Sequence, residues 1–188
     1  MSTTFKQAGP EVILMVSKVL RKHRSHEPVL DAGVTFDILF AHASEESGCA
    51  LEKNGVRELG ITRIVNLCDR VKGLADVEIK LDGNWWDHTT NPEREALLDH
   101  QLHHIEVQEG KRDDIGRPVI KLRHHDVDVG WFAIVAERNG IYAVERTQAK
   151  SVMDAYGQYF WPDVVSVFKA SDADIFTSRP HDKALSPP

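Results

Sequence analysis

The sequence predicts a single α+β domain in which a small antiparallel sheet packs beside a mostly buried helix. Hydrophobic residues make up 41% of the 188 residues and charged residues 28%, a balance that allows a buried core. Segments 34–41, 61–69 and 75–83 contain β-forming or alternating residues, which predicts strands. Segments 11–23 and 91–105 repeat apolar residues at helical spacing. Strands and helices mixed in this way indicate an α+β fold.

We expect three regions along the chain. Residues 1–30 form an N-terminal helical segment, residues 31–170 form the main domain, and residues 171–188 form a disordered tail. The last residues, SRPHDKALSPP, are polar and end in two prolines, which is typical of a terminus without structure. The sequence leaves open whether residues 1–30 belong to the main fold or to an interface with a partner.

The N-terminal helix is expected to be amphipathic. In EVILMVSKVLRKH (11–23), Val12, Val16 and either Val19 or Leu20 recur at helical spacing and form one apolar face. The basic residues gather near the C-terminal end, where positive charge is favourable. We therefore expect this helix to lie with its valine face against other apolar residues.

Three segments are predicted to form the sheet. VTFDILFA (34–41) is rich in β-forming residues, and ITRIVNLCD (61–69) alternates well enough for a strand. ADVEIKLDG (75–83) alternates most regularly, with apolar and charged side chains on opposite faces. Such alternation is typical of a half-exposed strand or of a strand at the edge of a sheet.

Composition excludes several classes of protein. The formal net charge of −6 argues against broad nucleic-acid binding, and no apolar run reaches the roughly 18 residues of a membrane span. The first residues lack the pattern of a secretory signal. The two cysteines, Cys49 and Cys68, do not make a disulfide framework, so we expect a cytoplasmic location. Cys68 lies in an apolar run and is predicted to be buried.

The helix at 91–105 has a clear beginning. Asn91 before Pro92 is a favourable start, and Thr90 with Glu93 forms an alternative start as a capping box. The helix presents three stripes, which are apolar (Leu98, Leu102, Ile105), polar (Glu95, Asp99, Glu106) and mixed (Ala96, Leu97, His100, His104). Water is therefore expected on the polar side only, which makes the helix mostly buried.

His100 and His104 are four residues apart and lie on one face of this helix, where two imidazoles can converge on a zinc ion. His103 leans toward the polar stripe and is expected to be exposed. A third ligand must come from elsewhere. The candidates follow the next ordered segment and are His124, His125, Asp126 and Asp128. Incidental histidines on a helix are the alternative interpretation.

These motifs resemble the phage metallopeptidase family, whose members look like small zincins. The resemblance is carried by NPEREALLDHQLHHI (91–105), by KLRHHDVD (121–128) and by the preceding DVEIKLDGNWWDHT (76–89). It implies a zinc ion held by His100, His104 and a later ligand, most simply His125. It also implies a phage or prophage origin, a bacterial host cytoplasm, and a helix beside an antiparallel sheet whose edge strand (75–82) pairs with a peptide.

The sequence departs from the family at Gln101, where the helix of a zincin carries the general-base glutamate. Glutamine can hydrogen-bond a water molecule but cannot usefully accept its proton. A peptidase with this chain should therefore be inactive or strongly impaired. The glutamine is either natural, as in a zinc-binding pseudo-enzyme, or a substitution made to trap an inactive state. Glu106 and Glu109 are weaker alternatives for the base.

Other residues have possible roles in binding. Trp85 and Trp86 are predicted to lie on a strand, with one side chain in the core and one exposed, and with Lys80 they are candidates for substrate binding. Arg123 is a possible partner of Asp99.

The main hypothesis is a zinc metallopeptidase-like protein acting on a peptide or protein. The rival is a non-catalytic, zinc-stabilised module that binds a host or phage protein. Action at nucleic acid is a weaker third interpretation.

Overall fold

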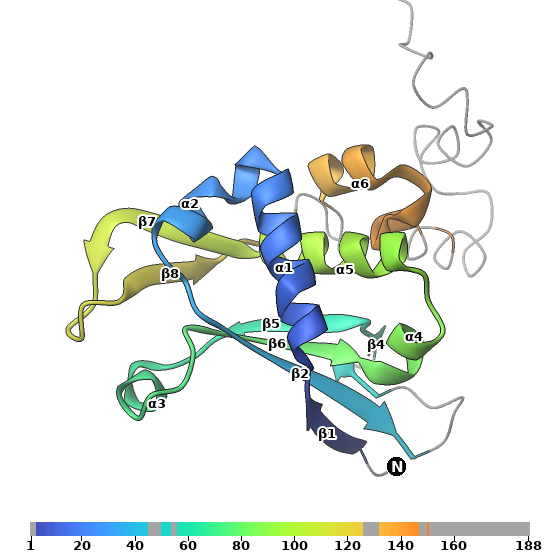
Figure 1. The fold of residues 1–188 in the computed structure, drawn as a ribbon, viewed down its shortest axis with the longest axis horizontal. Helices are drawn as coiled ribbons and strands as arrows, with labels where there is room; N and C mark the ends of the chain where they lie inside the picture. The colour runs from blue at the N-terminus through green and yellow to red at the C-terminus, as the bar shows by residue number, and fades with distance from the viewer. Residues whose placement is uncertain (1–2, 45–49, 54–55, 126–131, 147–149, 151–188) are drawn as a thin grey trace, which may run out of the picture.

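A four-stranded sheet and the helices that cover one of its faces form the main layers of the protein (Figure 1). The computed structural model describes residues 3–44, 50–53, 56–125, 132–146 and 150. The elements of the described residues, in chain order, are β1 (Thr3–Gln7), α1 (Pro10–Lys22), the 3-10 helix η1 (Arg24–His26), α2 (Glu27–Asp31), β2 (Phe36–Ala43), β3 (Glu52–Lys53), β4 (Val56–Arg57), β5 (Gly60–Ile64), α3 (Leu67–Val71), β6 (Val77–Asp82), α4 (Gly83–Asp87), α5 (Asn91–His103), β7 (Ile105–Arg112), β8 (Pro118–Leu122), α6 (Ala133–Asn139) and the 3-10 helix η2 (Gly140–Tyr142). The tail predicted at 171–188 lies outside the described residues.

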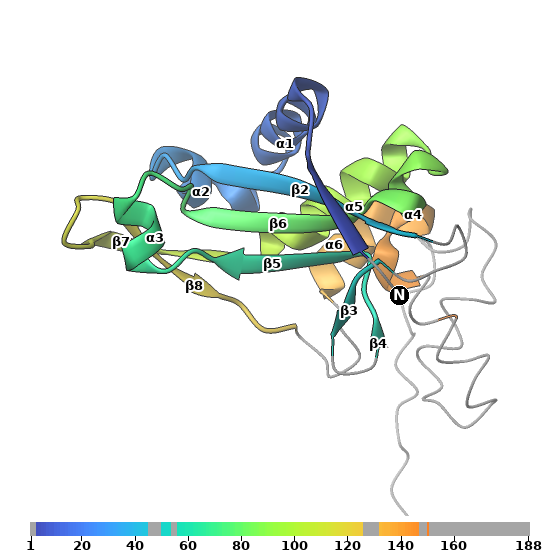
Figure 2. The same cartoon turned by 90° about the horizontal axis from the view of Figure 1, so that it is seen from below.

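The sheet is mixed, which corrects the prediction of an antiparallel sheet. Its strand order is β1-β2-β6-β5, with β2 and β6 parallel and the two outer pairs antiparallel. Figure 2 shows β2, β6 and β5 side by side, with the β7–β8 hairpin beyond β5. Parallel strands cannot be joined by a short hairpin. Here the chain leaves β2, returns as the edge strand β5, which is antiparallel to β6, and then enters β6 between the two.

Strand β6 lies inside the sheet, so the prediction of an edge strand at 75–82 was wrong. Val77, Ile79 and Leu81 point into the core and are fully buried. The opposite face carries charge but is also covered, because Glu78 pairs with Arg63 and Asp82 pairs with Arg57. The alternation of apolar and charged residues in β6 therefore reflects an apolar core on one face and ion pairs on the other, rather than one solvent-exposed face. The edge strands of this sheet are β1 and β5.

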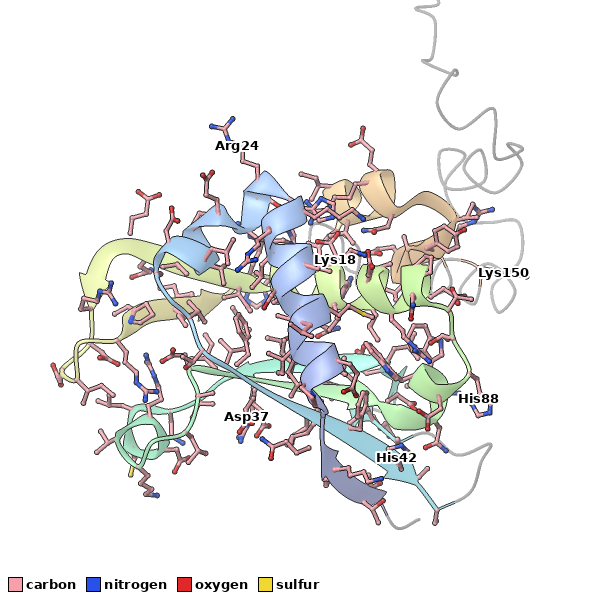
Figure 3. All side chains as sticks on the ribbon, in the orientation of Figure 1. Lys18, Arg24, Asp37, His42, His88 and Lys150 are labelled. Carbon is pink, nitrogen blue, oxygen red and sulfur yellow. The ribbon has the colours of Figure 1, made fainter. Side chains whose placement is uncertain are left out.

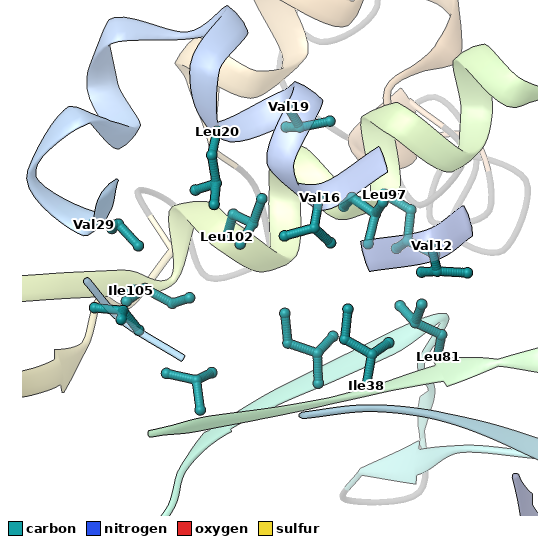
Figure 4. Packing of buried hydrophobic residues seen from close by; sticks show 14 of the residues in the cluster. Val12, Val16, Val19, Leu20, Val29, Ile38, Leu81, Leu97, Leu102 and Ile105 are labelled. Carbon is teal, nitrogen blue, oxygen red and sulfur yellow. The ribbon is translucent and has the colours of Figure 1, made fainter. Parts of the chain in front are cut away.

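Helix α1 packs its valine face against α5 and the sheet, and the amphipathic helix predicted at 11–23 is confirmed. Val12, Val16, Val19 and Leu20 are buried in the main core. Figure 4 shows these residues together with Leu97 and Leu102 of α5 and with Ile38 and Leu81 of the sheet. Strand β1 pairs with β2 along its whole length. Residues 3–30 therefore contribute a strand, a helix and part of the core to the same fold.

Helix α5 begins with the capping box formed by Thr90 and Glu93, one of the two starts that the sequence suggested. Its eight residues from 96 to 103 are all buried. The predicted wet side was wrong, because Asp99 and His103 are buried too. Helix α6 and the 3-10 helix η1 pack against α5, and both contribute partners to the buried Asp99.

The buried carboxylate of Asp99 joins three parts of the chain. It accepts hydrogen bonds from His26 Nε2 of η1 (2.7 Å), and from Arg138 Nε and Asn139 Nδ2 of α6 (2.6 Å each). Burial alone would raise the pKa of the Asp99 carboxyl, but these bonds and the charge of Arg138 outweigh burial and lower it far below its usual range. Arg138, not the suggested Arg123, is therefore the arginine that pairs with Asp99.

Three further local predictions need correction. The segment at 61–69 leaves the sheet at Ile64 and continues into α3, whose start is capped by the Asn66 side chain. Cys68 lies on this short helix and is exposed rather than buried. Trp85 and Trp86 belong to α4 rather than to a strand, because the Asp82 carboxylate accepts the Trp85 N–H and starts a helical turn. None of the helices in the described segments is long and apolar enough to cross a membrane.

We expect the Asp99→Ala variant to lower the free energy of unfolding by about 3–5 kcal/mol, because it leaves buried cationic and amide groups without their acceptor. Since the folded pKa is depressed, the carboxylate stabilises the fold above its unfolded pKa of about 3.9 and loses this effect as the pH falls toward the folded pKa. The difference from the parent protein should therefore be large at pH 7 and shrink below about pH 4.

Urea unfolding followed by circular dichroism measures this difference. Asp87→Ala is the matched control, because the Asp87 side chain is 65% exposed and its removal should cost less than about 1 kcal/mol. Equal stability of the Asp99→Ala and Asp87→Ala variants at pH 7 would contradict the structural role of Asp99.

Candidate metal site

Three histidines meet where α5 faces the end of the β7–β8 hairpin. His100 and His104 lie one turn apart at the end of α5, and His125 follows β8. One ring nitrogen of each histidine lies within 4.8 Å of one ring nitrogen of the other two. The Nε2 atoms of His100 and His125 are 3.3 Å apart. Three ligand atoms this close can bind one metal ion.

The two helix histidines are held by hydrogen bonds at their other ring nitrogen. His100 Nδ1 donates to the buried Glu145 carboxylate (2.6 Å), and His104 Nδ1 donates to the backbone carbonyl of Arg123 (2.9 Å). A neutral imidazole that donates from Nδ1 has its lone pair on Nε2. Both Nε2 lone pairs are therefore the ones that could bind a metal ion. The same arrangement is found when a carboxylate or carbonyl orients a metal-binding histidine.

The environment keeps His104 neutral. Burial lowers the pKa of His104 to about 3, more strongly than the Arg123 carbonyl raises it, and the neighbouring charges of His100 and His125 lower it further. Phe132, which is fully buried, lies against the rings of His100, His104 and His125 at centroid distances of 5.2, 4.8 and 4.8 Å. A neutral imidazole is the form that binds a metal ion, so this donor set fits a divalent cation.

Gln101 points from α5 toward the edge strand β5. Its Oε1 accepts a hydrogen bond from Thr62 Oγ1 (2.8 Å). Gly60 lies on the same strand, and a Cβ atom at this position would come within 2.9 Å of the Gln101 side chain. Glycine thus permits the close approach of β5 to α5. Because Thr62 donates, a glutamate at position 101 could accept the same hydrogen bond.

A cavity of about 140 Å³ opens at these residues. The described residues that line it come from four places, which are β5 with the residues just before it, the end of α5, the end of β8 with the residues after it, and Lys53 of β3. His100, His104 and His125 lie in its wall together with Gln101. Glu58 also lines it, and burial raises the pKa of the Glu58 carboxyl, although the charges of Lys53 and His100 act in the opposite direction. The cavity combines ligand atoms, an amide and a carboxylate.

Comparison with known families agrees with this geometry. The family model described as "Putative phage metallopeptidase" matches residues 7–169. The chain belongs to this family. The match confirms the resemblance inferred from the helix and from the segment around His125. Searches of curated proteins and of solved structures returned no match. Membership of a phage metallopeptidase family accords with a metal ion at the three histidines.

The other predicted site residues that the structure describes do not belong to the group of three histidines. His124 lines the cavity but is not part of the three-histidine group, and Asp126 and Asp128 lie outside the described residues. Trp85 and Trp86 on α4 and Lys80 on β6 do not line the cavity. Trp86 stacks with Phe40 and is buried, whereas the Lys80 ammonium lies near Glu78 and over the Phe5 ring.

His103, predicted to be exposed, is buried, and its ring contacts Phe132 at a centroid distance of 4.7 Å. Its Nε2 accepts a hydrogen bond from Arg123 (3.0 Å), and burial together with the charge of Arg123 lowers its pKa to about 4.

The sequence did not point to Glu145, Phe132, Glu58 or Thr62. These residues lie far from the histidine helix along the chain and carry no motif, so only the folded structure brings them to the site.

We expect His100→Ala, His104→Ala and His125→Ala each to abolish stoichiometric metal binding, because three nitrogen donors are reduced to two. His88→Ala is the control, since His88 is an exposed histidine at the end of α4, away from the cavity (Figure 3). Elemental mass spectrometry on untagged protein measures metal per chain. Retained metal in His125→Ala together with loss in His124→Ala would reassign the third ligand.

The hydrogen bond from His100 to Glu145 gives a separate expectation. Glu145→Gln keeps the shape but removes the charge that orients and polarises the imidazole, so the metal should bind about 10–100-fold more weakly. Competition with a chromophoric chelator measures this change. An unchanged affinity, with the fold intact by circular dichroism, would show that Glu145 does not act through His100.

Proposed function

We propose that this phage metallopeptidase family member is a zincin-like protein that holds one zinc ion with His100, His104 and His125. The support is the convergence of three ring nitrogens, two of them oriented by hydrogen bonds at Nδ1. Three protein nitrogen ligands with an open fourth position are the donor set of a catalytic zinc site, whereas structural zinc sites have four protein ligands. The reaction class would be hydrolysis of a peptide bond.

Zinc in such a site supplies Lewis acidity, which lowers the pKa of a water molecule and polarises a carbonyl group. Orienting the water and accepting its proton are the roles of the protein's own side chains. Gln101 occupies the position of the general base, and its amide can orient a water but cannot take up the proton. General-base catalysis contributes about 10²–10⁴-fold, so hydrolysis that relied on Gln101 at this position should be slow.

A peptide substrate is expected to bind along β5. This strand is at the edge of the four-stranded sheet, and Gly60, Ile61 and Thr62 line the cavity. Within the described residues, β5 forms a ladder only with β6. An extended peptide could therefore add to the other edge through backbone hydrogen bonds and pass beside the histidines. The peptide-binding strand is therefore expected to be β5 rather than the strand at 75–82.

A non-catalytic, zinc-stabilised binding module is the second candidate function. It is favoured by Gln101, whose side-chain acceptor is already used by Thr62. It is also favoured by the way the site joins segments that are far apart, since α5, His125 and Glu145 meet there. In such a module the metal would hold these segments together, and a host or phage protein would bind the edge strand.

We expect Gln101→Glu to raise the rate of peptide hydrolysis, by up to about 10²–10⁴-fold, because it restores a proton acceptor at the base position. Release of fluorescence from a quenched random peptide library measures the rate, and zinc content is measured in parallel. A variant that retains zinc but gains no activity, together with unfolding of the parent protein on chelation, would contradict the enzymatic proposal and favour the binding module.

A further inference from the structure

We propose that Glu58 is a second carboxylate of this site and acts as its general base in the absence of a glutamate at position 101. This inference rests on the proposed function, because it concerns the same hydrolysis. It assigns a catalytic role to a residue that lies outside the histidine helix but lines the same cavity.

The position of Glu58 is fixed by the backbone around it. Glu58 lies between β4 and β5, and its N–H donates to the Leu51 carbonyl (3.0 Å). The carbonyl of the next residue, Leu59, accepts the Asp82 N–H of the neighbouring strand (2.9 Å). These two bonds hold the segment that leads into β5. The side chain of Glu58 therefore reaches the cavity from a supported backbone rather than from a free loop.

Glu58 is the only carboxylate among the described residues that line the cavity. The group of three histidines with mutually close ligand atoms does not include it. Its role is therefore that of a group that shares the cavity with the ligands without being one of them. The charge of His100 acts on the Glu58 carboxyl, which places the two groups in one electrostatic environment.

The Glu58 carboxylate is also unengaged, which separates it from the buried carboxylates nearby. Asp82 is used by Trp85 N–H and Arg57, Asp99 by His26 and α6, and Glu145 by His100. Across the described part of the chain, the half-buried Glu58 side chain makes no hydrogen bond or ion pair. A carboxylate that is partly removed from water normally has a partner, so one without a protein partner is available to a water or a substrate.

The chemistry of a base at this position balances without another reactant. Glu58 accepts a proton from the attacking water as the water oxygen forms a bond to the carbonyl carbon of the peptide. The carbon–nitrogen bond then breaks, and the departing amine takes the proton from Glu58. Burial raises the pKa of this carboxyl, and a base with a raised pKa accepts a proton more readily at neutral pH. One water is consumed for each bond, and Glu58 is regenerated.

The test compares the parent protein with Glu58→Gln, Gln101→Glu and the double variant, all as full chains loaded with zinc. Glu137→Gln is the matched control, because Glu137 is an exposed glutamate on α6 outside the cavity. With the quenched peptide library as substrate, we expect Glu58→Gln to lower kcat/KM at least 10-fold and Glu137→Gln to leave it unchanged. The double variant should recover the activity of Gln101→Glu, since a carboxylate at either position can serve.

A second readout does not depend on activity. Glu58→Gln should keep one metal per chain but change the visible absorption spectrum of the cobalt(II)-loaded protein, because a group lining the metal cavity is altered. Glu137→Gln should leave that spectrum unchanged. Parent-like activity and an unchanged cobalt spectrum in Glu58→Gln would overturn the role of Glu58, with Gln101→Glu still active. Inactivity of every variant, Gln101→Glu included, at full zinc occupancy would overturn the proposed function and the base with it.

Discussion

Helix α5 brings polar side chains into the interior of the protein, and each of them must find a hydrogen-bonding partner there. Asp99, His100, Gln101 and His103 are all buried. A buried polar group without a partner costs about 1–3 kcal/mol, and an uncompensated charge costs more. This constraint determines which elements can surround the helix, because each neighbour must supply the matching donor or acceptor as well as apolar contacts.

The partners come from five different parts of the chain. Asp99 is satisfied by η1 and α6, His100 by Glu145, Gln101 by Thr62 of β5, and His103 by Arg123 after β8. The same hydrogen bonds that make the helix compatible with burial therefore position the walls of the cavity. In particular, the bonds at Nδ1 of His100 and His104 turn the other ring nitrogens toward His125. Stability of the fold and orientation of the candidate ligands have one physical origin.

Local sequence signals predicted the parts of the structure that depend on neighbours along the chain. The valine spacing of α1, the capping box of α5 and the pairing of His100 with His104 are all visible in short windows. The parallel pairing of β2 with β6 and the interior place of β6 are not, because they depend on a crossing connection and on coverings supplied by distant residues. For the same reason Glu145, 45 residues from His100, and Glu58, between β4 and β5, could not be found from the helix motif.

We propose that three imidazoles, and no other protein groups, hold one zinc ion at the end of α5. X-ray absorption at the zinc K-edge of the zinc-loaded full chain reports the atoms bound to zinc. We expect nitrogen and oxygen ligands at about 2.0–2.1 Å, with the multiple scattering of three imidazoles and a remaining water ligand. A sulfur ligand at about 2.3 Å, or scattering from fewer than three imidazoles, would contradict it.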